Sequence, residues 1–318
     1  MEIKRLLFIY NPKSGRGLIT AYLPEILKIF DRAGYMITLY RTRYPGDGVA
    51  IVASEGTDYD LIVCAGGDGT LNGVVTGLMS VEPEQRPCVG FIPAGSTNDS
   101  RGNYNLPSNI PHAARIAVNG TPFATDVGTC NDKYFSYVTS FGKLSAVSCF
   151  TPQSAKNVLG RTAYLTEGIK VLMKMPTHSV KITHDGGEIS GEYLLGVVTN
   201  ALRVGGFANI MGRDVDLQDG IFEIMLIKRP EDLAEFYMEI EAVLLSDNNT
   251  HPAIEEGLVT RFKSSRLTFE SNEDLQWVVD GEDAGRHKRV DVTNINRAVR
   301  IMTGPVKKIQ TMVLRDID

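Results

Sequence analysis

The sequence lacks any long hydrophobic run and any excess of basic charge. No segment of its 318 residues approaches the roughly 18–20 consecutive apolar residues that a membrane-spanning helix needs. Lysines and arginines number 33 against 38 aspartates and glutamates, which gives a net charge of −5. This balance argues against a nucleic-acid-binding protein that relies on overall positive charge. We therefore expect no transmembrane segment and no nucleic-acid partner.

Cysteine is scarce, and two common nucleotide-binding motifs are missing. The four cysteines (Cys64, Cys88, Cys130 and Cys149) have no metal-ligand spacing, so we expect reduced core residues in a cytoplasmic protein. The absence of Gly-x-x-x-x-Gly-Lys-[Ser/Thr] excludes a P-loop enzyme. No Gly-x-Gly-x-x-Gly follows the first predicted strand, which weakens the case for a hydride-transferring enzyme.

Length and composition predict a folded protein of two domains. Hydrophobic residues make up 43% of the chain and charged residues 22%, which are ordinary values. The chain is also longer than one hydrophobic core usually serves. We place the first domain at residues 1–122 and the second at residues 123–303, and we expect residues 304–318 to pack back on the first domain.

Strands and helices alternate in the first domain. Apolar runs predict the strands, and apolar residues at helical spacing predict the helices between them. This order is typical of an α/β domain, a parallel sheet with flanking helices whose ligands bind at the carboxyl ends of its strands. The predicted strands are 6–10, 35–40, 61–65 and 88–93, and the predicted helices are 18–33, 49–54 and 71–79.

Strand-like runs dominate the second domain, and we expect a mainly antiparallel β-sandwich. Asp185-Gly186 between two runs predicts a hairpin. Helices are predicted at Tyr164–Met173 and Leu233–Leu245, and the apolar stripe of the first favours core packing over a wall for an acyl chain or a membrane-contact face. The predicted strands are 134–140, 180–183, 193–199, 221–227, 266–270, 276–279 and 290–292.

A glycine-rich loop follows the strand predicted at 61–65. Residues Gly66-Gly67-Asp68-Gly69-Thr70 lead from this strand into a helix, and such glycines let backbone N–H groups approach phosphate oxygens. Asp68 would repel a bare phosphate, so it suits a site where a divalent metal bridges the two. A tight strand-to-helix turn is the alternative for this loop taken alone.

Three further segments favour the nucleotide site. Asn11-Pro12-Lys13-Ser14-Gly15 follows the first strand, Thr42 follows the strand at 35–40, and Ala94-Gly95-Ser96-Thr97-Asn98-Asp99 follows the strand at 88–93. The carboxyl ends of parallel strands meet at one edge of a sheet, so we expect these polar groups to converge.

Acidic groups in the rest of the chain have two interpretations each. Asp280-Gly281-Glu282 could supply a general base beside the nucleotide or could be only a polar β-turn. The acidic run Asp214–Gly220 suits a hard cation such as Mg²⁺, and solvated turn charges are the competing explanation. Asp126 lies near the predicted domain junction and is a weak signal by itself.

These motifs in this order resemble the diacylglycerol kinase catalytic-domain family, and in particular its bacterial soluble lipid kinases. The resemblance rests on Gly66–Asn72, Ile92–Asp99 and Asp280–Glu282, and it includes Asn11-Pro12-x-Ser14-Gly15 and Phe135-x-x-x-x-Ser140-x-Gly142. It spans nearly the whole chain. The Gly-Gly-Asp-Gly-Thr motif alone is shared with NAD kinases and phosphofructokinases, whereas the full set is much more specific.

The resemblance implies an ATP- and Mg²⁺-dependent lipid kinase with the nucleotide in the cleft between two domains. By position, Asp68 and Asp126 would help to hold catalytic Mg²⁺, and Glu282 would be the general base on a lipid hydroxyl. A structural Mg²⁺ would be bound by the Asp219 carboxylate and the carbonyls of Asp216 and Ile221. The residues that would contact ATP are Asn11, Pro12, Lys13, Ser14, Gly15, Thr42, Gly66, Gly67, Asp68, Gly69, Thr70, Leu71, Asn72, Gly73 and Ser96.

The sequence departs from the family pattern at three places. Ser96 stands where the family usually has threonine, which keeps the hydroxyl. Arg101 comes one place early after Asn98-Asp99, and residues 206–211 lack the prolines common before the metal loop. The last two changes fall near the expected acceptor site, so the identity of the lipid stays open.

The most favoured acceptor is diacylglycerol, which would be phosphorylated to phosphatidic acid during transient peripheral contact with a membrane. An NAD kinase-like or other small-molecule kinase is one alternative. A non-catalytic lipid- or nucleotide-binding regulator is another, although pure binding does not require Asp68 and Glu282. The sequence is also compatible with a homodimer.

Overall fold

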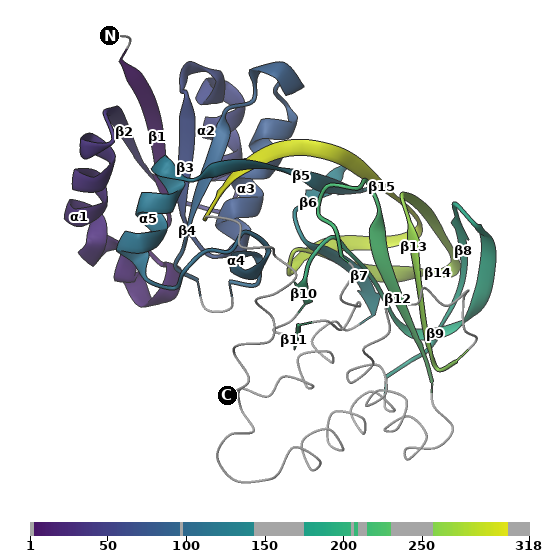
Figure 1. Cartoon of the computed structure of the whole chain (residues 1–318). Coiled ribbons are helices and arrows are strands. Elements are labelled where there is room, and N and C mark those ends of the chain that lie inside the picture. The colour runs from purple at the N-terminus through teal and green to yellow at the C-terminus, as the bar shows by residue number, and fades with distance from the viewer. Residues whose placement is uncertain are drawn as a thin grey trace. The chain divides into compact units, whose positions relative to one another are not determined.

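The computed structural model describes residues 3–95, 98–142, 175–204, 207–208, 215–229 and 257–304 (Figure 1). Both helices predicted in the second domain, residues 305–318, Ser96, Asp214 and Cys149 lie outside these ranges.

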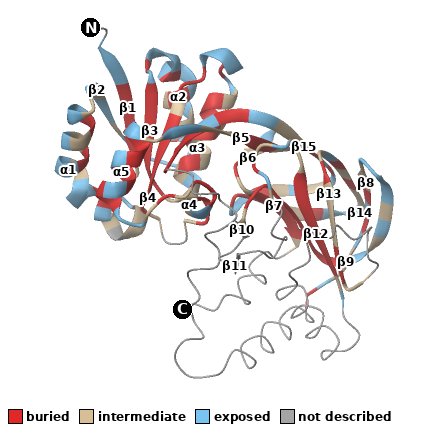
Figure 2. Cartoon of the chain, in the orientation of Figure 1, coloured by how far each residue is buried: buried red, intermediate tan, exposed pale blue. Residues whose placement is uncertain are grey.

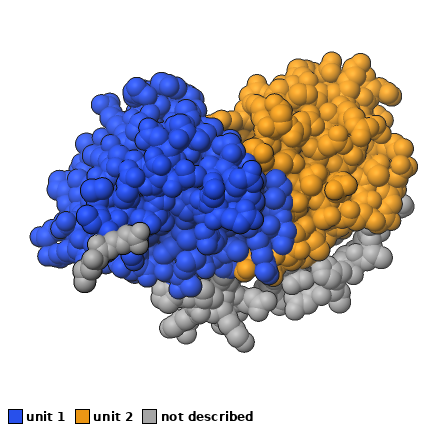
Figure 3. Space-filling model, turned by 90° about the horizontal axis from the view of Figure 1, so that it is seen from above, with its two compact units in different colours: residues 1–127, 295–318 blue, residues 128–294 orange. Residues whose placement is uncertain are grey.

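The chain divides into two compact units. Unit 1 comprises residues 1–127 and 295–318, and unit 2 comprises residues 128–294 (blue and orange in Figure 3). The boundaries expected after 122 and 303 lie five and nine residues from these limits. The chain passes between the units within two continuous strands, β5 (Thr121–Cys130) and β15 (Glu282–Thr303). A continuous strand does not have the composition of a linker, so the sequence gives no signal for the boundary between the two units.

Unit 1 contains a parallel sheet in the order β2–β1–β3–β4. Strand β3 is buried at every position (Figure 2), and because side chains of a strand alternate between two faces, both faces of the sheet are covered there. The end of β15 also joins this sheet, where Ile301 pairs in parallel with Val89. The strands are β1 (Lys4–Tyr10), β2 (Tyr35–Arg41), β3 (Leu61–Gly66) and β4 (Cys88–Pro93).

The helices of unit 1 pack closely on the sheet and on each other. Phe30 of α1 and Ala117 of α5 share a core with Phe8 and Val63 of the sheet. Helices α2 and α3 meet at Gly77, where an added Cβ would lie only 2.7 Å from Val52 Cβ. The helices are α1 (Leu18–Arg32), α2 (Asp47–Glu55), α3 (Asp68–Met79), α4 (Ser100–Asn103) and α5 (Ile110–Asn119), with 3₁₀ turns at Ser14–Gly17, Gly56–Asp58 and Pro83–Gln85. In the part of the chain that the structure describes, no helix is long and apolar enough to span a membrane.

The strands of unit 2 are antiparallel, and four of them close a ring. Strands β9 (Gly187–Thr199) and β14 (Arg266–Val279) each pair with β8 (His178–His184) near one end and with β7 (Val138–Gly142) near the other. Trp277, Phe141 and Phe269 contact one another in the core of this ring. Strands β12 (Phe222–Lys228) and β13 (Val259–Ser264) extend it beyond β9, and β6 (Lys133–Phe135), β10 (Arg203–Val204) and β11 (Phe207–Ala208) are short.

The prediction of a single strand at 134–140 is wrong in one respect. The segment forms two strands, β6 and β7, separated by Ser136 and Tyr137. The N–H groups of these two residues donate to the side chain of Asp280 instead of to a neighbouring strand. The strands predicted at 266–270 and 276–279 are, conversely, one strand, β14, with a register shift between Glu270 and Leu275. The hairpin predicted at Asp185-Gly186 is confirmed between β8 and β9.

Candidate active site

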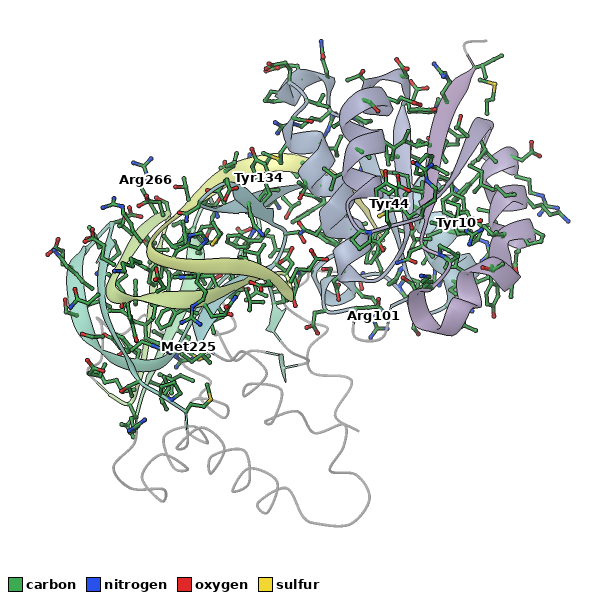
Figure 4. All side chains as sticks on the ribbon, turned by 180° about the vertical axis from the view of Figure 1, so that it is seen from behind. Tyr10, Tyr44, Arg101, Tyr134, Met225 and Arg266 are labelled. Carbon is green, nitrogen blue, oxygen red and sulfur yellow. The ribbon has the colours of Figure 1, made fainter. Side chains whose placement is uncertain are left out.

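The segments that follow the four parallel strands are joined by backbone hydrogen bonds. The N–H of Asn11, after β1, donates to a carbonyl of β3 (3.0 Å), and the N–H of Thr42, after β2, donates to the carbonyl of Tyr10 (3.0 Å; Tyr10 is labelled in Figure 4). The N–H of Ala94, after β4, donates to the carbonyl of Gly66 (2.7 Å). The structure therefore brings together, within unit 1, the polar segments that the sequence places after separate strands.

Two glycines allow the loops at this edge to touch backbone to backbone. Gly15 has φ +54°, and a Cβ there would lie 1.9 Å from the carbonyl oxygen of Ala94. A Cβ on Gly95 would lie 2.5 Å from the Cα of Gly67. Neither approach is open to a residue with a side chain, so glycine at 15 and 95 is a condition for the convergence of these three loops.

Asparagine side chains close two of the loops. Asn11 Oδ1 accepts from the N–H of Lys13 (2.9 Å). Asn98 has φ +53°, its Oδ1 accepts from the N–H of Gly95 (2.8 Å), and its Nδ2 donates to the carbonyl of Gly95 (2.8 Å). Sequence reasoning did not single out Asn98 as a site residue. The available signal is that asparagine tolerates the left-handed region and bonds to nearby backbone.

Helix α3 begins inside the glycine motif, three residues before its predicted start. Its N-cap residue Gly67 is extended, and no side chain caps the helix in the described part of the chain. Uncapped N–H groups and the helix dipole favour an anion at such a terminus. The Leu71 side chain is fully buried, so it packs in the core, whereas Asn72 Oδ1 is buried and has no hydrogen-bond partner among the described residues.

Asp68 links the glycine motif to the loop after β4. Its carboxylate accepts from the N–H groups of Asp99 (3.1 Å) and Ser100 (3.0 Å), at the start of α4. Each oxygen of a carboxylate can accept more than one bond, so both retain capacity for a further ligand. Asp68 therefore holds two loops together and still presents the oxygens that a cation prefers.

Asp126 is 1% exposed and organises β15. Its Oδ1 accepts from Asn296 Nδ2 (2.9 Å) and from the N–H of Arg297 (2.7 Å), and Arg297 has φ +50°. The carboxylate thus stabilises an irregular, left-handed position within a long strand.

The acidic residues of unit 1 suit a metal ion that binds together with a phosphate-containing substrate. Across the described ranges, no three His, Cys, Asp or Glu side chains gather to hold a metal ion. Mg²⁺ commonly binds through one or two carboxylates together with water and substrate phosphates rather than in a closed protein site. Asp68, between two loops at the start of α3, fits that kind of coordination.

The predicted structural-metal segment precedes β12 in unit 2. Asp216 Oδ1 accepts from the N–H of Gln218 (3.1 Å), and Asp219 Oδ1 accepts from the N–H of Ile221 (2.9 Å). Burial raises the pKa of Asp219, and the nearby charge of Asp216 adds to the shift. These turn-closing bonds are compatible with solvated turn charges and with a cation alike, so the metal assignment stays a prediction.

Glu223, close to this segment, was missed by sequence reasoning. It is 2% exposed on β12, and burial raises its pKa to about 8 although Lys263 Nζ lies 3.3 Å from its Oε1. The available signal is a glutamate inside the otherwise apolar run Phe222–Ile227.

The two acids at the β14–β15 turn have different environments. Asp280 (φ +47°) and Gly281 (φ +88°) form the tip of the turn, as in a type I′ hairpin. The Asp280 side chain is buried and accepts four hydrogen bonds from Ser136, Tyr137 and Val138. Burial raises its pKa to about 6, against the lowering effect of these donors. Glu282 instead is exposed at the first position of β15.

The segment after Thr42 is held by Asp47, a residue that the sequence analysis did not identify. Asp47, at the start of α2, is 1% exposed and accepts from Tyr40 Oη (2.7 Å) and from the N–H (2.8 Å), Nε (3.1 Å) and Nη2 (3.0 Å) of Arg43. The bonds from Arg43 hold the pKa of Asp47 well below its usual range. This cluster holds the chain between β2 and α2, and so the position of Thr42.

The chain is similar to known proteins along most of its length. Residues 5–130 match the model of the diacylglycerol kinase catalytic domain. Two curated relatives named diacylglycerol kinase are each 34% identical: one from Bacillus subtilis (strain 168) over 285 residues (89% of this chain, 91% of the relative) and one from Staphylococcus epidermidis (strain RP62A) over 302 residues (94% and 92%). The crystal structure of a diacylglycerol kinase from Bacillus anthracis has the same fold, with a TM-score of 0.74 at 23% identity over 96% of this chain and 98% of that one. The similarity extends along nearly the whole chain, and the fold has glycine-rich loops at the edge of a parallel sheet. The chain therefore belongs to the diacylglycerol kinase family.

Proposed function

We propose that the protein is an ATP- and Mg²⁺-dependent lipid kinase that phosphorylates diacylglycerol to phosphatidic acid. The observation that carries the proposal is the backbone contact of the loops at Gly15, Gly67 and Gly95 around the uncapped start of α3. In a chain of this family, glycine loops gathered around a helix N-terminus are suited to the phosphates of ATP.

The nucleotide binds, in this proposal, along the carboxyl edge of the unit 1 sheet. It is surrounded by residues Asn11–Gly15, Thr42, Gly66–Gly73 and Ser96, and the N-terminus of α3 faces the phosphates. The buried, unpartnered Oδ1 of Asn72 is a further group that a bound ligand can satisfy.

Glu282 removes the proton from the acceptor. The hydroxyl proton passes to the Glu282 carboxylate, and the hydroxyl oxygen forms a bond to the γ-phosphorus of ATP. The bond from that phosphorus to the bridging oxygen breaks, and ADP leaves with its electron pair. The exposure of Glu282 supports this role, because a base has to reach a substrate that comes from outside the protein.

Asp68 and Asp126 are the proposed holders of the catalytic metal. When bound, Mg²⁺ neutralises charge on the transferring phosphate. The Asp219 carboxylate and the carbonyls of Asp216 and Ile221 would hold a second, structural Mg²⁺. In both places the donors are oxygens, as a hard cation requires.

Unit 2, residues 128–294, would bind the lipid. The substrate requires a cytoplasmic enzyme to make transient peripheral contact with a membrane. The departures at Arg101 and at residues 206–211 fall near the expected acceptor site, so the lipid assay decides the acceptor. A homodimer stays a prediction.

The test is a radiolabelled ATP assay on detergent micelles containing diacylglycerol, with and without Mg²⁺, in parallel with an assay on NAD. We expect labelled phosphatidic acid only with Mg²⁺ and no labelled NADP. Glu282→Gln should lower kcat about 10²–10⁴-fold, the usual contribution of a general base, while the Kd for ATP stays within about twofold. Labelled NADP without labelled lipid, or a Glu282→Gln variant at the wild-type rate, would contradict the proposal.

A further inference from the structure

The carboxylate of Asp280 lies at the centre of four donors. Oδ2 accepts from the N–H of Ser136 (2.7 Å) and from Ser136 Oγ (2.8 Å), and Oδ1 accepts from the N–H groups of Tyr137 (3.1 Å) and Val138 (2.9 Å). The N–H of Asp280 in turn donates to the carbonyl of Val138 (2.9 Å). The turn at the end of β14 is therefore bonded along its length to the segment between β6 and β7.

A hairpin turn alone does not need this arrangement. Type I′ turns are satisfied by asparagine or glycine at the first central position, and a buried charge is costly to keep. Asparagine in place of Asp280 would offer one oxygen, and its NH₂ group would face N–H donors in either orientation. Both carboxylate oxygens are thus needed to satisfy Ser136, Tyr137 and Val138 at once.

The segment that Asp280 holds is itself anchored on its other side. The carbonyl of Tyr137 accepts from the N–H of Asn200 (3.1 Å) and from the hydroxyl of Thr199, at the end of β9. Strand β7 then pairs with both β9 and β14. The turn at Asp280 is therefore fixed to the core of unit 2 from two directions, and it is not a free hairpin tip.

Glu282 follows this turn at a distance of two residues. Val279 pairs with Glu282 across the base of the turn, so the backbone of Glu282 is set by the same four-residue unit that Asp280 immobilises. The carboxylate of Glu282 is exposed, and no hydrogen bond to it occurs in the described residues, so nothing else in them fixes its direction. A base that must meet a hydroxyl at hydrogen-bond distance depends on such positioning.

We propose that Asp280 is the positioning residue for the general base, and that it fixes the direction of Glu282 by clamping the β14–β15 turn onto Ser136–Val138. The inference rests on the proposed role of Glu282 as the base. Asp280 itself touches no substrate, because its side chain is buried and both of its oxygens are occupied within unit 2.

The test compares Asp280→Asn with a matched control, Asp185→Asn. Asp185 is also a turn carboxylate that clamps a neighbouring segment, since it accepts from the N–H of Ser265, but it lies at the β8–β9 turn, at the opposite end of β9. Each purified variant is assayed with ATP and diacylglycerol micelles at least about 15 °C below its measured Tm. We expect Asp280→Asn to lower kcat at least tenfold with the KM for ATP unchanged, and Asp185→Asn to lower Tm without changing kcat.

A merely structural role would lower the Tm of Asp280→Asn and leave the kcat of the folded enzyme within twofold of wild type, and this result would overturn the proposal. If Asp280→Asn does not fold, Ser136→Ala removes one donor only, and the same reasoning predicts a twofold to fivefold fall in kcat with the KM for ATP unchanged. Glu282→Gln separates the two assignments. If Glu282→Gln is inactive and Asp280→Asn is fully active, only the positioning role is wrong; if Glu282→Gln is fully active, the base assignment fails first.

Discussion

The close approach of Gly67 and Gly95 predicts different effects for alanine at these two positions, in the loops after β3 and β4. A Cβ on Gly95 would lie 2.5 Å from Gly67 Cα and 2.8 Å from Asn98 Oδ1, whereas a Cβ on Gly67 would lie 3.4 Å from Gly95 Cα. Carbon atoms are in optimal contact at about 3.5–4.0 Å. Gly95→Ala must therefore push two backbone segments apart by about 1 Å, and Gly67→Ala needs almost no shift.

The size of the effect follows from that displacement. Overpacking against rigid backbone costs about 1–3 kcal/mol, and each kcal/mol lowers Tm by about 2–4 °C in a domain the size of unit 1. We expect Gly95→Ala to lower Tm by about 2–12 °C, and Gly67→Ala by less than about 2 °C. Because these loops are the proposed phosphate site, a shift of about 1 Å in them should also lower kcat/KM for ATP about a hundredfold in Gly95→Ala.

Thermal unfolding and ATP kinetics on both variants check this prediction, with Gly48→Ala as the control. Gly48 lies in α2 with nothing within 4 Å of its Cβ position. Alanine there should be neutral or slightly stabilising, because glycine is a poor helix former. The reasoning is refuted if Gly95→Ala is as stable as Gly48→Ala, or if Gly67→Ala loses more stability than Gly95→Ala.

Two further predictions concern Asn98 and Asp280. Asn98 has φ +53° and makes two hydrogen bonds to Gly95. In thermal unfolding, Asn98→Gly should lose only the stability of these bonds, and Asn98→Ala should lose a further ~1 kcal/mol because alanine disfavours the left-handed backbone. Equal losses of stability in the two variants would contradict this. Asp280 has its pKa raised from 3.8 to about 6, chiefly by burial, so its stabilising contribution is complete below pH 3.8 and is lost as the pH rises towards 6. Denaturant unfolding should therefore show wild type losing roughly 2 kcal/mol relative to Asp280→Asn between pH 4 and pH 7, and parallel pH profiles would refute the shift.

The meeting of the polar loops at one edge of the unit 1 sheet could be predicted because parallel topology leaves little freedom. Once strands and helices alternate, the residues after β1, β2, β3 and β4 must gather at one edge, whatever the details of packing. What the sequence could not show is the distance of approach. That Gly15 touches Ala94 while Gly67 leaves room for a methyl group depends on loop geometry that no local pattern encodes.

The second unit was harder to predict because its local breaks depend on distant residues. The chain between Tyr134 and Ser140 has a strand-like pattern, but it is interrupted by a carboxylate more than 140 positions away. Strand β14 likewise continues from Glu270 to Gln276 through a register shift, and this shift is defined by its pairing with β15. Periodicity reports which residues are apolar, and it does not report which buried polar group competes for backbone N–H groups.

The acidic residues show why motif reading alone assigns chemistry too freely. Asp68, Asp126 and Asp280 all lie in positions that suggested metal or base chemistry, and each of them accepts backbone N–H groups from a segment remote in sequence. Glu282 is the exposed acid of the set, without a hydrogen bond to its carboxylate in the described ranges. A carboxylate that accepts hydrogen bonds from backbone N–H groups can still bind a metal ion, because its oxygens keep lone pairs. It is poorly suited to take up and release a proton in every catalytic cycle. Burial and bonding therefore separate the acids that hold loops from the one that is free to act as a base.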